Sequence, residues 1–228
     1  MYSLLKPALF GIDPEIAHDL TIHSLQFVGR CLGASSPIQG RSCEVAGLRF
    51  DNPIGLAAGL DKNAVAVSGF SRFGFGHIEV GTVTPRAQPG NPKPRVFRLE
   101  HDQGLINRFG FNNDGIDALV ARLTNHPYAG IIGVNIGKNK STSNETAHED
   151  YVHCLQKAAA VSDYITINVS SPNTPRLRDL ADADKILDVV APVLVAREGL
   201  QNRRQQTLPV FVKLAPDFLD QDLQKVLE

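Results

Sequence analysis

The sequence lacks the features that mark several specialised classes of protein. Its net charge is -1, with 23 Lys and Arg against 24 Asp and Glu, so no basic excess indicates a nucleic-acid partner and no acidic excess indicates a disordered tail. No stretch approaches the ~18 consecutive apolar residues of a membrane span. Internal repeats and low-complexity segments are also missing. These absences favour a globular domain, and 228 residues are enough for one full core.

Cysteine and histidine are too few and too scattered to form a recognisable metal site. Cys31, Cys43 and Cys154 make no C-x-x-C pair, so neither a disulfide framework nor a zinc site follows from their spacing. They are expected to be inert thiols in a reducing compartment. His18 and His23 do not have the i, i+4 spacing that would place two ligands on one helix face. No metal is therefore expected.

Residues 1–40 predict two short amphipathic helices. The first is indicated by apolar residues at helical spacing, Leu4, Leu5, Ala8, Leu9 and Phe10. The second begins at Asp13-Pro14-Glu15, which combines an N-cap, a first-turn proline and an acid beside the positive end of the helix dipole, and it ends near Gly33. Its apolar residues fall roughly on one face: Ile16, Leu20, Phe27 and Val28. Such helices either pack on the main domain or form an apolar hood that rests on a membrane or encloses an apolar substrate.

Residues 41–228 predict alternating strands and helices. After a short strand or hairpin arm at 44–50 and a run of small residues at 53–63, strands are expected at 77–83, 130–137, 164–169 and 208–214. Helices are expected at 65–73, 114–125, 147–160, 183–196 and 217–227, and a long proline-rich loop at 84–95. Strands that alternate with helices form a parallel sheet. Both a doubly wound sheet and a (β/α)8 barrel satisfy this pattern.

The nucleotide-binding fingerprint of the doubly wound fold is absent. Gly74-x-Gly76 has Glu79 where the third glycine should stand, and no G-x-x-x-x-G-K-[ST] occurs. What recurs instead is a polar residue at or just after each expected strand: Lys62, Thr82, Asn135, Asn168 with Ser171, and Lys213. In a barrel these ends share one face, which is where barrel enzymes hold their active sites. For the turn at 168–175 alone, a connector whose polar side chains satisfy its own backbone is an equal alternative.

Several motifs taken together resemble those of the quinone-dependent class of dihydroorotate dehydrogenases, in order and spacing and over nearly the whole chain. They are AAGLDK at 57–62, EVGTVTP at 79–85, RVFR at 95–98, NRFGFN at 107–112, VNIG at 134–137 and NVSSPNT at 168–174. The resemblance implies a TIM barrel, preceded by a helical membrane and quinone-access segment at 1–40. It also implies oxidation of dihydroorotate to orotate through FMN, with a membrane quinone as electron acceptor, in pyrimidine (UMP) synthesis.

The same resemblance assigns roles to residues. Ser171 is the catalytic base. The FMN-binding residues are Ala58, Gly59, Leu60, Asp61, Lys62, Thr82, Asn135, Asn168 and Lys213. The substrate-binding residues are Lys62, Asn107, Arg108, Phe109, Gly110, Phe111, Asn168 and Asn173. His18 and Arg98 line the quinone tunnel. Lys213 would stabilise the anionic reduced flavin, and Lys62 would pair with the substrate carboxylate.

The chain departs from the family pattern in its length. Residues 41–228 supply about five β/α units of the barrel, so the last three units and the FMN phosphate loops after strands 7 and 8 are expected to be missing. An inactive fragment that cannot retain FMN is therefore an alternative. Another FMN barrel, such as a tRNA dihydrouridine synthase, would require a catalytic cysteine and a basic RNA-binding surface.

The N-terminus and the resemblance together set an expected location. Only Lys6 precedes Asp13 as a basic residue, which disfavours a secretory signal or an Arg-rich transit peptide. We therefore expect a bacterial protein that associates peripherally with the cytoplasmic face of the inner membrane through its N-terminal helices. The complete barrel is expected to be a monomer.

Overall fold

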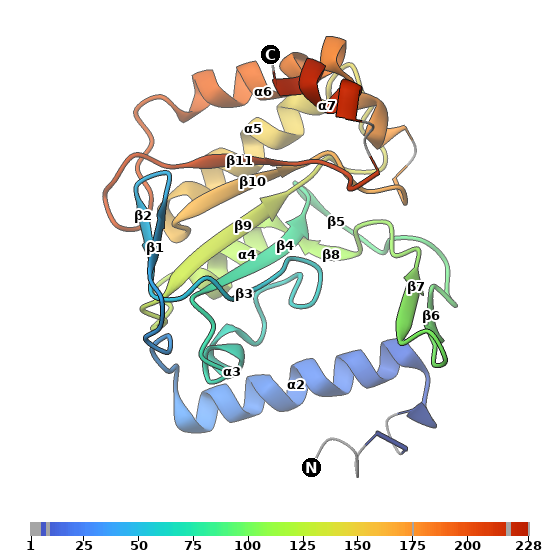
Figure 1. Cartoon of the computed structure of the whole chain (residues 1–228), viewed down its shortest axis with the longest axis vertical. Coiled ribbons are helices and arrows are strands. Elements are labelled where there is room, and N and C mark those ends of the chain that lie inside the picture. The colour runs from blue at the N-terminus through green and yellow to red at the C-terminus, as the bar shows by residue number, and fades with distance from the viewer. Residues whose placement is uncertain (1–5, 8–9, 175, 218–219, 228) are drawn as a thin grey trace.

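Five parallel strands form the central sheet. The computed structural model describes residues 6–7, 10–174, 176–217 and 220–227. The strand order is β11-β10-β9-β4-β3, and every pair of neighbours is parallel (Figure 1). The bounds are Gly55–Leu56 (β3), His77–Val83 (β4), Ile131–Ile136 (β9), Tyr164–Asn168 (β10) and Val210–Lys213 (β11). All four strands expected at 77–83, 130–137, 164–169 and 208–214 are thus confirmed, within two residues at each end.

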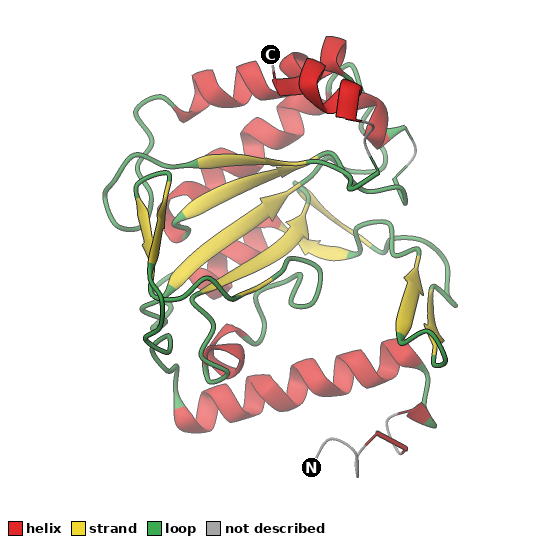
Figure 2. Ribbon diagram, viewed as in Figure 1, coloured by secondary structure: helices red, strands yellow, loops and turns green. Residues whose placement is uncertain are grey.

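Helices follow the strands and cover the outer face of the sheet. They are α3 (Val67–Ser71), α4 (Ile116–Leu123), α5 (Ala147–Ala158), α6 (Ala183–Arg197) and α7 (Asp220–Leu227), with short 3₁₀ turns η1 (Ala159–Val161) and η2 (Leu177–Ala181). Alternate strand residues such as Ile78 and Ile165 are fully buried in one core with Leu119 and Leu155 of the helices. Because successive strand residues point to opposite faces, the other residues line the inner face. The fold is an incomplete (β/α) barrel, as expected (Figure 2).

Helix α2 (Pro14–Leu32) lies away from α4, α5, α6 and α7 and packs against α3 (Figure 1). Its predicted start is confirmed, because Asp13 Oδ1 accepts the N–H groups of Glu15 (2.8 Å) and Ile16 (3.1 Å). Its predicted end at Gly33 is also confirmed, with φ of 69°. Most residues that indicated the first helix, Leu4, Leu5, Ala8 and Leu9, lie outside the described residues.

The apolar face predicted on α2 is largely exposed. The exposed fractions are 54% for Ile16, 53% for Leu20 and 68% for Phe27, while the buried residues of the helix include Ala17, Ile22 and Gly29. The predicted stripe therefore points away from the barrel. Within the described residues, no helix combines the length and apolar character needed to cross a bilayer.

Three antiparallel hairpins or ladders complete the described fold. The arm expected at 44–50 is the hairpin of β1 (Cys43–Val45) and β2 (Leu48–Phe50). Residues 84–95 were expected to be a loop, but they contain β5 (Arg86–Gln88), which pairs with β8 (Asn113–Gly115). Strands β5 and β8 are separated in the sequence by the hairpin of β6 (Val96–Leu99) and β7 (Gly104–Asn107). Local sequence patterns do not reveal a pairing between strands so far apart. Leu48 and Phe50 pack on Ile131 and Tyr164 at the N-terminal end of the sheet.

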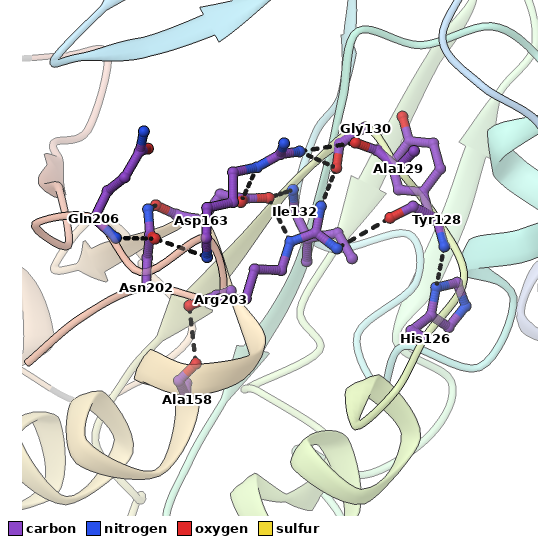
Figure 3. A network of polar contacts seen from close by, with 12 residues as sticks. His126, Tyr128, Ala129, Gly130, Ile132, Ala158, Asp163, Asn202, Arg203 and Gln206 are labelled. Carbon is purple, nitrogen blue, oxygen red and sulfur yellow. Dashed lines mark hydrogen bonds and ion pairs between the residues drawn. The ribbon is translucent and has the colours of Figure 1, made fainter.

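A buried carboxylate organises the N-terminal end of the strands (Figure 3). Asp163, fully buried before β10, accepts the Nε–H groups of Arg203 (2.8 Å) and Arg204 (2.6 Å) and the N–H of Ile132 (2.7 Å). Both arginines also donate to the carbonyl of Gly130. Since both come from the α6–β11 connection, this ion-pair cluster fixes β11 relative to β9 and β10.

Replacing Asp163 with Asn is expected to lower the free energy of unfolding by about 3–5 kcal/mol, because two arginines lose their counter-charge at a buried position. Urea unfolding followed by circular dichroism measures the change. The matched control is Asp117→Asn, which breaks an exposed ion pair with Lys157 and is expected to cost less than about 1 kcal/mol. Equal effects of the two substitutions would contradict a structural role for the buried cluster.

Candidate active site

Three polar side chains from three neighbouring strands meet at the C-terminal edge of the sheet. Thr82 Oγ1 donates to Asn135 Oδ1 (2.5 Å), and Asn168 Nδ2 donates to Thr82 Oγ1 (2.8 Å) and to Asn135 Oδ1 (3.1 Å). All three residues are buried. The sequence placed each of them at a strand end, and the parallel sheet brings them into direct contact. Their mutual bonds fix the orientation of each amide.

A charged residue that was not predicted as a site residue, Glu79, is hydrogen-bonded to this cluster. Glu79 Oε1 accepts Asn135 Nδ2 (2.8 Å), and Glu79 Oε2 accepts the hydroxyls of Tyr164 (2.9 Å) and Thr166 (3.3 Å). Burial, followed by the charge of Glu79, raises the pKa of Tyr164 well above its usual value, so the phenol stays a donor. A carboxylate in the middle of a strand that is expected to be buried was the signal in the sequence.

The inner face of the sheet lines a cavity of about 650 Å³. Its wall includes Ala57 and Ala58 from the run of small residues, Glu79 and Thr166 from the strands, and Lys213. Lys213 is exposed and is paired in register with Asn168 on the adjacent strand. The cavity wall therefore combines the cation of Lys213 and the carboxylate of Glu79 with the small residues Ala57 and Ala58, at which a flat polar molecule can approach the backbone closely. The rings of Phe50, Tyr164 and Phe211 also line it.

The segment after Ala58 separates this cavity from a second one. Gly59 donates its N–H to Gly81 O (2.8 Å), which ties the run of small residues to β4. The carboxylate of Asp61 is buried and accepts the N–H groups of Val65 and Ala66, each at 2.8 Å. Its side chain thus stabilises the turn before α3, and neither cavity includes Asp61 among its lining residues. Burial raises the pKa of Asp61.

Lys62 is half-buried with its ammonium group 4.0 Å from the centre of the Phe109 ring. Burial lowers the pKa of Lys62 to about 8, and the nearby charge of Arg95 acts in the same direction. Among the described residues, no carboxylate forms an ion pair with this ammonium group. A partly desolvated ammonium group of this kind is suited to bind an anionic ligand.

The loops expected to hold the substrate are joined to one another. Asn173 Nδ2 donates to Asn107 O (3.4 Å), and Asn91 Nδ2 donates to the carbonyls of Arg108 (3.0 Å) and Asn173 (3.3 Å). Ser171 Oγ accepts the N–H of Asn173 (3.2 Å). Ser171 is only partly buried, on the loop directly after β10. Asn91, which the sequence analysis did not select, therefore connects the segment at 107–111 with the segment at 171–173.

The remaining residues of the expected substrate segment are engaged in the fold. Arg108 Nε and Nη2 donate to Pro94 O at 3.2 and 2.9 Å. The carbonyls of Gly110 and Phe111 accept Gln88 Nε2. Phe111 is buried with φ of 55°. These residues can offer backbone groups to a ligand, while the side chain of Arg108 is directed to the β6–β7 hairpin.

Two residues next to the expected set have buried atoms without a hydrogen-bond partner in the described part of the chain. They are Asn112 Oδ1 and Thr174 Oγ1. Buried polar atoms are normally satisfied, so both are candidates for contact with a bound polar molecule. Their position at the ends of the NRFGFN and NVSSPNT motifs was the signal in the sequence.

His18 and Arg98 line a second, mostly apolar cavity of about 390 Å³ between α2 and the β6–β7 hairpin, together with Ile22, Leu60 and Phe109. His18 Nε2 lies 2.8 Å from Leu60 O, and Arg98 Nη1 donates to Ile12 O (2.8 Å). The structure thus places both predicted quinone residues in one apolar pocket beside Gly59.

Comparison with known proteins gives a consistent result. The family model described as dihydroorotate dehydrogenase matches residues 41–228. The chain is 48% identical to dihydroorotate dehydrogenase (quinone) of Aromatoleum aromaticum, covering 96% of this chain and 62% of the relative. It is also 48% identical to the protein of the same name from Pasteurella multocida, covering 100% of this chain and 69% of that relative.

Solved structures agree in fold. The crystal structure of DHODH from Eimeria tenella in complex with ferulenol superposes with a TM-score of 0.83 at 36% identity, covering 94% of this chain and 62% of that one. The ligand-free form from the same organism gives a TM-score of 0.82 at 39% identity. The chain therefore spans about 62% of the length of some of these relatives. On this similarity in sequence and fold, the chain belongs to the dihydroorotate dehydrogenase family.

Proposed function

We propose that the chain carries the FMN, dihydroorotate and quinone sites of a quinone-dependent dihydroorotate dehydrogenase. The observation that carries this proposal is the contact of Thr82, Asn135 and Asn168 at one edge of the sheet, with Lys213 in register beside Asn168. The alternative of a tRNA dihydrouridine synthase is not supported. That class requires a catalytic cysteine and a basic RNA-binding surface, whereas this chain has Ser171 and a net charge of -1.

The residues present fit the ring of FMN. A flat ring can lie against Ala58 in the inner cavity. The buried cluster of Thr82, Asn135 and Asn168 is bonded to Glu79 of the cavity wall and carries amide and hydroxyl groups at the strand ends. When bound, FMN supplies the acceptor for the hydride that leaves the substrate. The ammonium of Lys213 in the same cavity wall would stabilise negative charge on the ring of bound FMN.

The substrate carboxylate pairs with Lys62, and Asn107 and Asn173 hold the ring with their side-chain and backbone groups. Ser171 accepts the proton from the carbon next to the substrate carbonyl. A serine hydroxyl is a weak base at its ordinary pKa, so its action depends on orientation and on the exclusion of water. The N–H of Asn173 orients the Ser171 oxygen.

A membrane quinone occupies the second cavity in this proposal. Its apolar wall suits a lipid-soluble ring, while His18 and Arg98 provide polar groups for the quinone oxygens. The exposed stripe of Ile16, Leu20 and Phe27 on α2 rests on the membrane surface. The protein is then peripheral to a bacterial inner membrane.

The first experiment asks whether these 228 residues alone retain FMN, given the family's longer chains. Purified chain mixed with FMN and freed of excess is expected to keep the visible flavin absorption and to bleach when dihydroorotate is added without oxygen. Bound flavin that does not bleach contradicts the proposed substrate site. Loss of all flavin identifies the chain as an inactive fragment.

Ser171→Ala is expected to slow bleaching by dihydroorotate by about 10²–10⁴-fold, the usual contribution of a general base. Stopped-flow absorbance measures the rate, and the flavin spectrum should remain that of the parent chain. The control is Ser143→Ala at an exposed position, which should leave the rate unchanged. A parent-like rate in Ser171→Ala would refute the role of Ser171.

Arg98→Ala is expected to raise the apparent KM for a soluble quinone by about tenfold, because the loss of one charged hydrogen bond costs about 1.4 kcal/mol or more. Bleaching by dihydroorotate should be unaffected, since the second cavity lies beyond Gly59. Steady-state oxidation with varied quinone provides the measurement, and Arg30→Ala elsewhere on the N-terminal segment is the control. A change confined to the bleaching rate would contradict a quinone site here.

A further inference from the structure

A buried ion pair joins the N-terminal segment to the loop at 84–95. Glu15, in the first turn of α2, is only 7% exposed, and Arg95 is 6% exposed. Arg95 Nη2 donates to Glu15 Oε1 (2.7 Å), and Arg95 Nε donates to both carboxylate oxygens at 3.2 and 3.1 Å. These bonds hold the pKa of Glu15 below its usual value. Lys93 adds a more exposed ion pair with Glu15 at 3.2 Å.

The guanidinium group of Arg95 is also held by backbone carbonyls of its own loop and by the Phe109 ring. Arg95 Nη1 donates to the carbonyls of Pro89 (2.6 Å) and Asn91 (2.9 Å). Asn91 in turn donates its N–H to Phe109 O (2.9 Å). The guanidinium carbon lies 5.5 Å from the centre of the Phe109 ring, the same ring that the Lys62 ammonium contacts at 4.0 Å. Two cations thus share one aromatic ring, and within the described part of the chain Arg95 alone of the two forms an ion pair with a carboxylate.

The charges around Lys62 compete with one another. Burial and the positive charge of Arg95 favour the neutral amine, whereas the carboxylates of Glu15, Asp19 and Asp61 favour the ammonium form. The side chain of Asp19 is 56% exposed, so solvent screens its charge. The carboxylate of Asp61 accepts hydrogen bonds from the backbone of the turn before α3. Glu15 is therefore the buried carboxylate that counters Arg95.

We propose that Glu15 and Arg95 act as a positioning pair for Lys62, in which Glu15 neutralises Arg95 so that the neighbouring ammonium keeps its charge and can bind a carboxylate. The carboxylate-binding part of this inference rests on the proposed function. Neither residue touches the ligand in this arrangement. Their effect is exerted through the charge and placement of Lys62.

The pair predicts opposite effects from its two partners. In Glu15→Gln, the charge of Arg95 is no longer countered, so the pKa of Lys62 should fall by at least about half a pH unit. In Arg95→Gln, a repelling cation is removed while Lys93 still accompanies Glu15, so the pKa should rise by a similar amount. If the ion pair had only a structural role, removing either partner would shift the pKa of Lys62 in the same direction.

Competitive trace labelling with acetic anhydride between pH 6 and 10, read by mass spectrometry, reports the pKa of Lys62 in the chain itself. It requires neither FMN nor substrate. The parent value is expected near 8, lower in Glu15→Gln and higher in Arg95→Gln. Asp19→Asn removes a carboxylate of the same charge from an exposed site and should shift the value by much less.

Circular dichroism must first show that each variant is folded. If Glu15→Gln does not fold, Arg95→Gln decides alone, and an unchanged or lowered pKa of Lys62 overturns the proposal. Shifts in the same direction from both variants, or a shift in Asp19→Asn as large as that in Glu15→Gln, overturn it as well.

Calorimetric titration with orotate separates this inference from the proposed function. In the parent chain, orotate binding should weaken as the pH rises through about 8, because the amine loses its proton, and this limit should move to lower pH in Glu15→Gln. Opposite pKa shifts without any orotate binding would reject the substrate assignment and leave the charge coupling intact. If orotate binding weakens at the same pH in Glu15→Gln and Arg95→Gln, the charge coupling is rejected.

Discussion

The register of parallel strands is the constraint on which the site depends. Thr82, Asn135 and Asn168 contact one another because β4, β9 and β10 run in the same direction and end at the same edge. A slip of one residue would turn each of these side chains to the opposite face. Asp163 opposes such a slip at the other end of the strands, since it binds both the N–H of Ile132 on β9 and two arginines from the connection to β11.

Buried or partly buried carboxylates occur at three levels of the molecule, and each joins segments that are distant in sequence. Asp163 lies at the N-terminal end of the strands, Glu79 lies within the inner face, and Glu15 lies between α2 and the loop at 84–95. Each accepts two or more hydrogen bonds, as a charge withdrawn from water requires. Long-range geometry in this fold is thus set by charged hydrogen bonds as well as by apolar packing.

Most of the barrel was predictable because its strands are apolar, short and regularly separated by amphipathic helices. The polar ends such as Asn135 and Asn168 were visible as an interruption of that pattern. Glu79 and Asn91 were not found, because their importance lies in partners more than fifty residues apart, Tyr164 and Asn173 respectively. The pairing of β5 with β8 was missed for the same reason: its two short strands enclose a whole hairpin.

The position of Phe109 connects the apolar pocket with the Lys62 ammonium group. Its ring contacts the Lys62 ammonium and also lines the pocket that contains His18 and Arg98. Any ligand of the apolar pocket that displaces this ring must alter the placement of the ammonium group. By thermodynamic linkage, an anion bound at Lys62 then changes the affinity of the apolar pocket by the same factor. One aromatic side chain thereby couples the apolar pocket to anion binding at Lys62.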